Sequence, residues 1–256
     1  MGGQGGVVSL GVVTWWWKPR PGYRSTYSAE TVNALFRMVR RGYPDIRPIC
    51  VTDQPDGLDP SITVIPDWQD FASVPSPHGG NNPSCYRRLR MFHPDIARHF
   101  GEDFVSVDQD MVFTGDLRSV WDRPEDIVLC RNWNPQPGNH YNGSMIRLKA
   151  GSRAQVWNDF DPTSSPMQAK SATCYGSDQV WISYCLGSKE ARWTKDDGVY
   201  SFMNDIAQNC KHLPENAKVV TFHGAHDPWS PYVQAHCPWV RDHYGDLRPP
   251  QEQASA

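Results

Sequence analysis

The chain has 256 residues, a length that one α/β domain can fill, and 39% of them are hydrophobic. Its 25 basic and 28 acidic residues give a net charge of −3, which provides no overall attraction to nucleic acid or to an acidic membrane. The seven cysteines form no Cys-x-x-Cys pair, which argues against a zinc ribbon and favours a reducing compartment. With no apolar run near ~18 residues and no basic leader, we expect a cytoplasmic protein without a membrane span.

Strands and helices alternate along the first half of the chain. Residues 7–17 are apolar and β-branched and predict a strand, and Ser28 is placed to cap a helix over residues 31–41. Further strands are predicted over Ile46–Thr52, 62–65 and 104–107, with a helix over 86–100 that Pro94 kinks or breaks.

The second half is more irregular but continues the same pattern. Its expected strands and helices cover residues 111–113, 117–121, 127–130, 141–148, 154–160, 177–186, 199–202 and 219–222. Alternation of this kind predicts an α/β fold with a mixed, mostly parallel sheet flanked by helices. We expect a single domain over residues 7–248, with flexible tails at 1–6 and 249–256.

Two carboxylates follow the buried strand at 104–107, in the sequence Asp108-Gln109-Asp110. Residues i and i+2 share a face, and ligands bind at the carboxyl ends of strands in open α/β sheets, so the pair suits Mg²⁺ or Mn²⁺. The chain is rich in aspartate, and a second pair, Asp159 and Asp161, ends a predicted helix and is interpreted as a turn. Position rather than spacing therefore singles out Asp108 and Asp110.

A histidine, His223, follows the predicted strand at 219–222 in the same way. Histidine beside a glycine at the end of a strand is well placed to bind a metal ion. Two aspartates and one histidine would leave open positions on an octahedral cation for the oxygens of a diphosphate.

Ordered motifs extend over most of residues 7–229. They are the first strand with Tyr27 and Asn33, Val51-Thr-Asp-Gln-Pro-Asp-Gly57, Tyr86-Arg-Arg-Leu-Arg-Met-Phe-His-Pro94, Val107-Asp-Gln-Asp110, Tyr141-Asn-Gly-Ser144, Gly176-Ser-Asp-Gln179 and Phe222-His-Gly224 with Pro228-Trp229. In this order they resemble the GT-A-fold glycosyltransferases, most closely family 8 and the glycogenin-like enzymes. The resemblance implies a GT-A (Rossmann-like) fold and transfer of a sugar from a nucleotide diphosphate sugar, usually a UDP-sugar, with retained anomeric configuration.

The resemblance also implies roles for individual residues. The metal ligands would be Asp108, Asp110 and His223, and the cation, Mn²⁺ or Mg²⁺, would offset charge on the leaving UDP. The catalytic residues would be Asp178 and Gln179 near the anomeric carbon and Asn142 beside the sugar. The donor would be bound by Thr14, Tyr27, Arg88, Asp108, Ser144, Gly224 and Trp229.

The sequence departs from the family pattern at Asp227, where the family usually has a lysine that contacts the diphosphate. Binding of the diphosphate would then depend on Arg87, Arg88 or Arg90, unless His226 substitutes for the lysine. The expected acceptor is a carbohydrate or a hydroxymethylated DNA base, with a protein as a third possibility. For DNA, the arginines at 37, 40, 41 and 47 could form a local basic patch. The alternative is a non-catalytic module that binds nucleotide sugars on a degenerate transferase fold.

Overall fold

The computed structural model describes residues 9–18, 27–75, 85–170, 177–224 and 226–245. The expected tails and the domain ends at 7 and 248 lie outside these ranges.

The strands are β1 (Leu10–Trp16), β2 (Ile46–Thr52), β3 (Thr63–Pro66), β4 (Asp103–Val107), β5 (Met111–Phe113), β6 (Ile127–Gln136), β7 (Asn139–Lys149), β8 (Ala191–Trp193), β9 (Val199–Ser201) and β10 (Val219–Thr221). The α-helices are α1 (Ala29–Gly42), α2 (Ala97–Phe100), α3 (Arg118–Trp121), α4 (Gln155–Asn158), α5 (Ser165–Ala169), α6 (Asp178–Leu186), α7 (Pro231–His236) and α8 (Pro238–Tyr244). Shorter or irregular helical segments are η1 (Cys85–Phe92), η2 (Lys195–Asp197), η3 (Phe202–Ile206) and η4 (Ala207–Asn209).

The main sheet has seven strands in the order β3-β2-β1-β4-β7-β6-β8. Every neighbouring pair is parallel except those of β7, which runs antiparallel to both β4 and β6. This is the mixed, mostly parallel sheet that the sequence predicted. A small second sheet, β5-β10-β9, pairs β10 antiparallel to β5 and parallel to β9.

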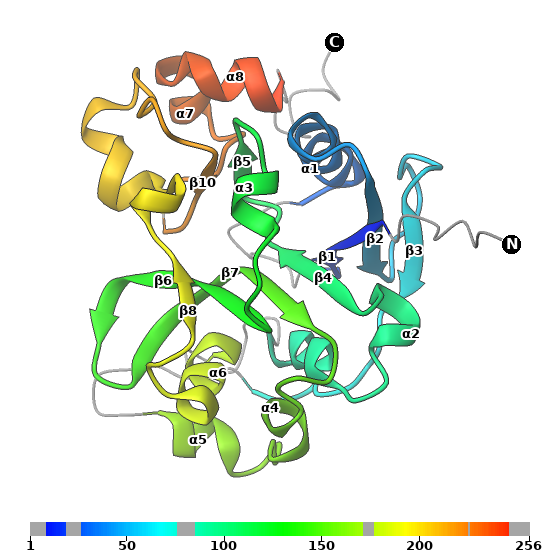
Figure 1. The fold of residues 1–256 in the computed structure, drawn as a ribbon. Helices are drawn as coiled ribbons and strands as arrows, with labels where there is room; N and C mark the ends of the chain where they lie inside the picture. The colour runs from blue at the N-terminus through cyan, green and yellow to red at the C-terminus, as the bar shows by residue number, and fades with distance from the viewer. Residues whose placement is uncertain (1–8, 19–26, 76–84, 171–176, 225, 246–256) are drawn as a thin grey trace, which may run out of the picture.

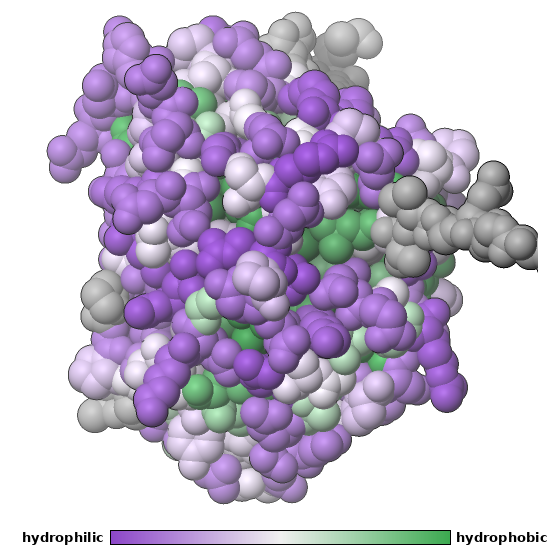
Figure 2. All heavy atoms as spheres, in the orientation of Figure 1, coloured by the Kyte–Doolittle hydropathy of each residue, from purple (hydrophilic) through white to green (hydrophobic). Residues whose placement is uncertain are grey.

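Alternating side chains of β1 contribute to two cores, one on each face of the main sheet. Val12 and Trp16 belong to the core that also contains α1, α8 and the small sheet, whereas Val13 and Trp15 belong to the core with η1, α2, α4 and α6. Figure 1 shows α1, α7 and α8 on one side of the sheet and α2, α4, α5 and α6 on the other. Hydrophilic residues cover most of the face seen in Figure 2, where apolar residues are visible mainly in hollows.

The helix expected over residues 86–100 is not one α-helix. Residues Cys85–Phe92 form a 3₁₀ helix, and α2 begins only at Ala97. Side chains three residues apart share a face in a 3₁₀ helix, so Arg87 and Arg90 point one way and Arg88 another. This separation decides which arginine reaches the candidate site.

The described residues contain no helix with the length and apolar character needed to cross a membrane.

Candidate active site

The turn after β4 is fixed by the residue between its two aspartates. Gln109 is buried, and its amide Nε2 donates to the carbonyl of Trp15 at 3.0 Å while its Oε1 accepts from the hydroxyl of Thr31 at 2.9 Å. The backbone N–H of Asp108 donates to the carbonyl of Ser144 at 2.8 Å. These bonds tie the turn to β1, α1 and β7, so the aspartates on either side of Gln109 have defined positions.

Arg88 contacts two other expected site residues, Asp108 and Asp178. Its side chain is almost buried, and Nη1 lies 2.8 Å from Oδ1 of Asp108 while Nε lies 3.4 Å from Oδ2 of Asp178. The same guanidinium donates to the carbonyl of Gly143 in β7. The Arg88 guanidinium therefore connects η1 with the end of β4, the start of α6 and β7.

Residues 142–144 of β7 complete this cluster. The Gly143 N–H donates to Oε1 of Gln179 at 3.2 Å, and the Ser144 N–H donates to Oδ1 of Asn142 at 2.9 Å. A Cβ at Gly143 would lie at ordinary contact distances, 3.4 Å from the Gln179 Cβ and 3.5 Å from Nη2 of Arg88, so β7 packs directly against both side chains. The structure thus brings together the three expected catalytic residues, with Asp108, Ser144 and Arg88.

The cluster carries more negative than positive charge. Burial raises the pKa of Asp108, with the Arg88 guanidinium opposing this shift and the Asp178 carboxylate adding to it. Burial alone would lower the pKa of Arg88, but the Asp108 and Asp178 carboxylates raise it further than burial lowers it. Asp110, also buried, adds a third carboxylate nearby. Such a site favours a cation or a developing positive charge.

Two of the residues expected to bind the donor, Tyr27 and Trp229, contact each other. The rings of Tyr27 and Trp229 meet edge to face with centroids 5.5 Å apart, and Trp229 also lies 6.0 Å from the ring of Tyr244 in α8. Gly224 has φ of +80°, a conformation that favours glycine. Thr14 is different, because its side chain is fully buried and its hydroxyl donates to the carbonyl of Val107 at 3.0 Å. The Thr14 side chain therefore bonds within the sheet, and its expected contact with the donor stays a prediction.

The two other arginines of η1 contact a neighbouring loop instead of the site. Arg87 pairs with Asp67 and lies 4.8 Å over the ring of Trp17. Arg90 lies 3.4 Å from Asp70, with Trp68 and Trp157 on its guanidinium at 5.2 and 5.3 Å. Of the three arginines considered for the diphosphate, only Arg88 lies among the expected site residues.

The backbone next to His223 contacts Asp110, but the His223 side chain contacts Ser201 instead. The Phe222 N–H donates to the carbonyl of Asp110 at 2.9 Å, whereas Nε2 of His223 lies 2.7 Å from the Ser201 hydroxyl. Burial lowers the pKa of His223, and Asp205 opposes this shift. Among the described residues, no three His, Cys, Asp or Glu side chains lie together in a way that could hold a metal ion. Asp108, Asp110 and His223 do not form such a group in this structure, and their role as metal ligands stays a prediction.

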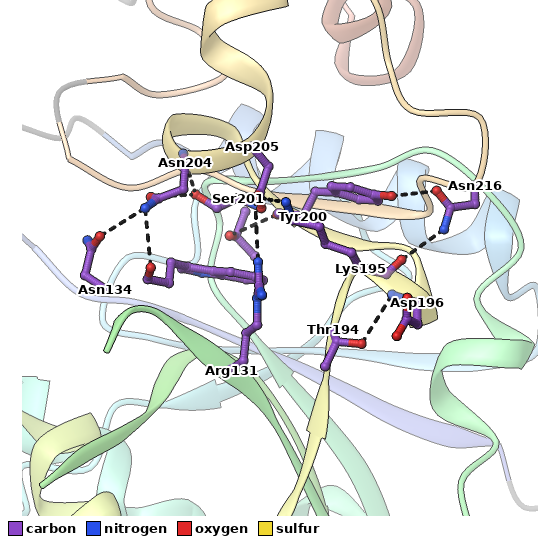
Figure 3. Close-up of polar contacts among 12 residues, drawn as sticks. Arg131, Asn134, Thr194, Lys195, Asp196, Tyr200, Ser201, Asn204, Asp205 and Asn216 are labelled. Atoms are coloured by element: carbon purple, nitrogen blue, oxygen red, sulfur yellow. Dashed lines mark hydrogen bonds and ion pairs between the residues drawn. The ribbon is translucent and has the colours of Figure 1, made fainter. Parts of the chain in front are cut away.

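Beside His223 lies a polar network that the sequence analysis missed. Asp205 accepts from the Ser201 N–H at 2.9 Å and pairs with Arg131 at 3.6 Å and Lys195 at 2.5 Å. The Asn204 amide donates to Oδ1 of Asn134 at 3.0 Å (Figure 3). We call these six residues, from β6, η2, β9 and η3, the polar bridge. A signal was present, since the Ser201 hydroxyl accepts from the Asn204 N–H in the Ser-x-x-Asn spacing of a helix cap.

No protein-family model matches the sequence, and no curated protein is similar to it in sequence. Solved structures of glycosyltransferases do match. The galactosyltransferase LgtC, solved with donor and acceptor sugar analogues, has a TM-score of 0.61 and 14% identity, covering 96% of this chain and 99% of LgtC. GlyE of Streptococcus pneumoniae TIGR4 has a TM-score of 0.57 and 9% identity over 91% of this chain and 61% of GlyE, and the bifunctional WbbM has 0.53 and 12% over 93% and 52%. The chain therefore has the fold of these glycosyltransferases, which confirms the GT-A-type fold that the sequence predicted.

Proposed function

We propose that the chain is a metal-dependent glycosyltransferase that moves a sugar from a nucleotide diphosphate sugar, a UDP-sugar in our reading, to an acceptor hydroxyl. The observation that carries the proposal is the buried cluster in which Arg88 contacts both Asp108 and Asp178, next to Asn142 and Gln179. The cluster lies in a fold shared with LgtC, which was solved with donor and acceptor sugar analogues.

The residues of the cluster suggest how transfer would proceed. Carboxylates stabilise the positive charge that develops on a sugar ring as its bond to the diphosphate breaks. Gln179 has a neutral amide, a poor covalent nucleophile, so retention would proceed by attack on the same face, with the leaving phosphate helping to deprotonate the acceptor. One of the similar structures is an active-site mutant of LgtC in which a glutamine is replaced by glutamate, so the active site of that enzyme contains a glutamine.

Two carboxylates, Asp108 and Asp110, have the chemistry to bind Mn²⁺ or Mg²⁺. Both are at least partly buried at the end of β4, in a site with excess negative charge. Once bound, the cation would supply positive charge for the diphosphate of the donor. Asp108 and Asp110, with His223 as the resemblance implies, are the residues that would hold the cation.

Replacement of Asp110 by asparagine tests the proposal. We expect Asp110→Asn to lower Mn²⁺-dependent turnover of UDP-sugars by about 100-fold or more, because charge stabilisation at the leaving group is lost. The measurement is release of UDP from UDP-glucose and UDP-galactose, with Mn²⁺ and with EDTA. Asp159→Asn is the matched control, since Asp159 belongs to the other Asp-x-Asp pair and is exposed. Equal turnover by wild type and Asp110→Asn would refute the proposal.

A non-catalytic binder of nucleotide sugars is the second candidate, and Asp227 favours it. Asp227 is buried where the resemblance places a lysine for the diphosphate, and the change reverses the charge expected there. A binder would show a UDP-dependent rise in melting temperature without release of UDP. For the enzyme, the acceptor would be a carbohydrate or a hydroxymethylated DNA base.

A further inference from the structure

Strand β7 extends beyond the end of its neighbour β4. The pairing of the two strands covers residues 145–149 of β7 and ends with Val107 opposite Met145. In the part of β7 that precedes this pairing, the N–H groups of residues 140, 141 and 143 donate to side chains of α6. A buried N–H group needs an acceptor, so α6 supplies acceptors that a neighbouring strand would otherwise supply.

Ser183 of α6 accepts two of these hydrogen bonds. Its hydroxyl oxygen lies 3.1 Å from the backbone nitrogen of His140 and 3.3 Å from that of Tyr141. A hydroxyl oxygen has two lone pairs, so it can accept both bonds. Ser183 and Tyr141 are both buried, so loss of the hydroxyl would leave the Tyr141 N–H without an acceptor in the interior of the protein.

Gln179 and Ser183 lie on the same face of α6. They are four residues apart, and side chains at i and i+4 of an α-helix are neighbours. Since Gln179 Oε1 accepts from the Gly143 N–H at 3.2 Å, this face of α6 is attached to β7 at two points. The first residue of the helix, Asp178, is held separately by η1, because Nε of Arg88 lies 3.4 Å from its Oδ2.

The two points of attachment set the spacing between the expected catalytic residues. Asn142 lies between Tyr141 and Gly143, the β7 residues whose N–H groups bond to α6. Asp178 and Gln179 are the first two residues of α6. A shift of α6 along β7 would therefore change the distance from Asn142 to both of them. Catalysis is sensitive to such shifts, since a misplacement of about 1 Å can cost roughly 100-fold in rate.

We infer that Ser183 is a positioning residue for the proposed transfer: its hydroxyl fixes α6 against β7 and so sets the spacing between Asn142 and Gln179. The inference rests on the proposed function, since it requires these two residues to act on the same donor sugar. Ser183 is buried, so it acts through its neighbours and not by contact with a substrate.

Two variants of nearly equal shape test the role of the hydroxyl. Ser183→Thr keeps the acceptor, whereas Ser183→Val has a methyl group in its place. In ¹⁵N-labelled protein, the amide proton resonances of His140 and Tyr141 should move upfield in Ser183→Val and stay near their wild-type positions in Ser183→Thr. Ser152→Ala is the control, since the Ser152 hydroxyl makes a long contact of 3.5 Å with the Asp126 carbonyl. Equal resonance shifts in the valine and threonine variants would overturn the inference.

Turnover separates positioning from stability. Release of UDP from UDP-glucose and UDP-galactose with Mn²⁺ is measured well below the melting temperatures of both variants. We expect Ser183→Val to have a kcat about 10-fold lower than Ser183→Thr, with the KM for the donor little changed, because the substrate is bound but the catalytic groups are misplaced. Equal kcat values would overturn the positioning role. If wild type releases no UDP, the proposed function fails and the positioning role with it, while the amide resonances still decide whether Ser183 holds β7.

Discussion

Gln109 shows how a single uncharged side chain sets the position of two charged ones. Its amide links the turn after β4 to both β1 and α1, through the contacts with Trp15 and Thr31. Because the amide is buried, replacing it leaves the carbonyl of Trp15 without its donor in a region that water does not reach.

We therefore expect Gln109→Leu to reduce the free energy of unfolding by about 1–3 kcal/mol, the cost of an unsatisfied buried polar group. Urea denaturation gives the value. Gln69→Leu is the control, since Gln69 is exposed and makes only long contacts of 3.4 Å, and it should change stability by no more than about 0.5 kcal/mol. Equal effects of the two variants would contradict the assigned role of Gln109.

The lowered pKa of His223 predicts how stability depends on pH. Burial favours the neutral imidazole in the folded protein, and Asp205 opposes this only in part. The stabilising contribution is then complete above the ordinary histidine pKa of about 6.5 and is lost as the pH falls through the lower folded-state value.

The melting temperature of wild type should therefore fall more than that of His223→Gln as the pH is lowered from about 7.5 to about 5.5. His243 also has a pKa lowered by burial, so both proteins keep part of the dependence. Scanning calorimetry across this range gives the two slopes. Identical slopes would show that His223 makes no contribution to the pH dependence of the melting temperature.

At the scale of elements, η1 is held by a ladder of ion pairs. Arg87 pairs with Asp67, and Arg90 pairs with Asp70. The two arginines are three residues apart on η1, and the two aspartates are three residues apart in the loop after β3. The 3₁₀ repeat brings the two arginines onto one face, which an α-helix would not do as closely. The ladder thus leaves Arg88 free to face the candidate site.

Removing one partner of the buried ion pair between Arg87 and Asp67 should destabilise the fold. The side chains of Arg87 and Asp67 are almost entirely buried, so we expect Arg87→Gln to destabilise the fold by about 3 kcal/mol through the unpaired carboxylate. The double variant Arg87→Gln, Asp67→Asn should lose less than the single one in urea denaturation. The exposed pair of Arg37 and Glu30 is the control, with an expected effect below about 1 kcal/mol for Arg37→Gln. A double variant less stable than the single one would contradict the ladder.

The longer elements were predictable because local signals and burial agree. Ser28 caps α1 with Thr31 as its reciprocal partner, and Ile46–Thr52 forms β2 at the expected residues. Shorter elements were missed: α7 and α8 begin at Pro231 and Pro238, each spans less than two turns, and β8 has three residues. Tertiary packing rather than local propensity selects such elements. It also selects the 3₁₀ form of η1 over the α-helix expected from its composition.

For the whole molecule, the candidate site follows from topology that no local pattern contains. The order of strands places Asp108 beside Ser144, a separation of 36 positions along the chain bridged by one hydrogen bond. The sequence could suggest that Asp108 and Asp178 share a site only through the family resemblance. It could not show that Arg88 lies between them or that His223 turns toward Ser201, because both depend on which face of a strand or helix meets its neighbour.

The distribution of charge bears on the acceptor. The four arginines considered as a DNA-binding patch each contact a different partner: Arg37 bonds Glu30, Arg40 bonds Ser61, Arg41 bonds the His243 carbonyl and Arg47 bonds the His99 carbonyl. With a net charge of −3, the molecule also offers no general attraction to phosphates.

We therefore expect binding to unmodified duplex DNA to be weaker than the roughly 10⁻⁴–10⁻⁶ M typical of non-specific binding at physiological salt. Fluorescence anisotropy with a labelled duplex, at low and at physiological salt, gives the affinity. Tight binding that weakens steeply with salt would favour a DNA acceptor over a carbohydrate.

The antiparallel strand β7 gives the site its stiffness. β7 pairs with β4 from Met145 to Lys149 and with β6 on its other edge, and residues 142–144 lie next to this doubly paired stretch, with Asn142 opposite Cys130 and the Ser144 carbonyl bonded to the Asp108 N–H. Local opening of such a strand requires breaking bonds to two neighbours, so its amides belong to the part of a fold that exchanges with solvent last. A sugar that reaches Asn142 and Ser144 would meet backbone already in place, and none of its binding free energy would be spent on ordering that surface.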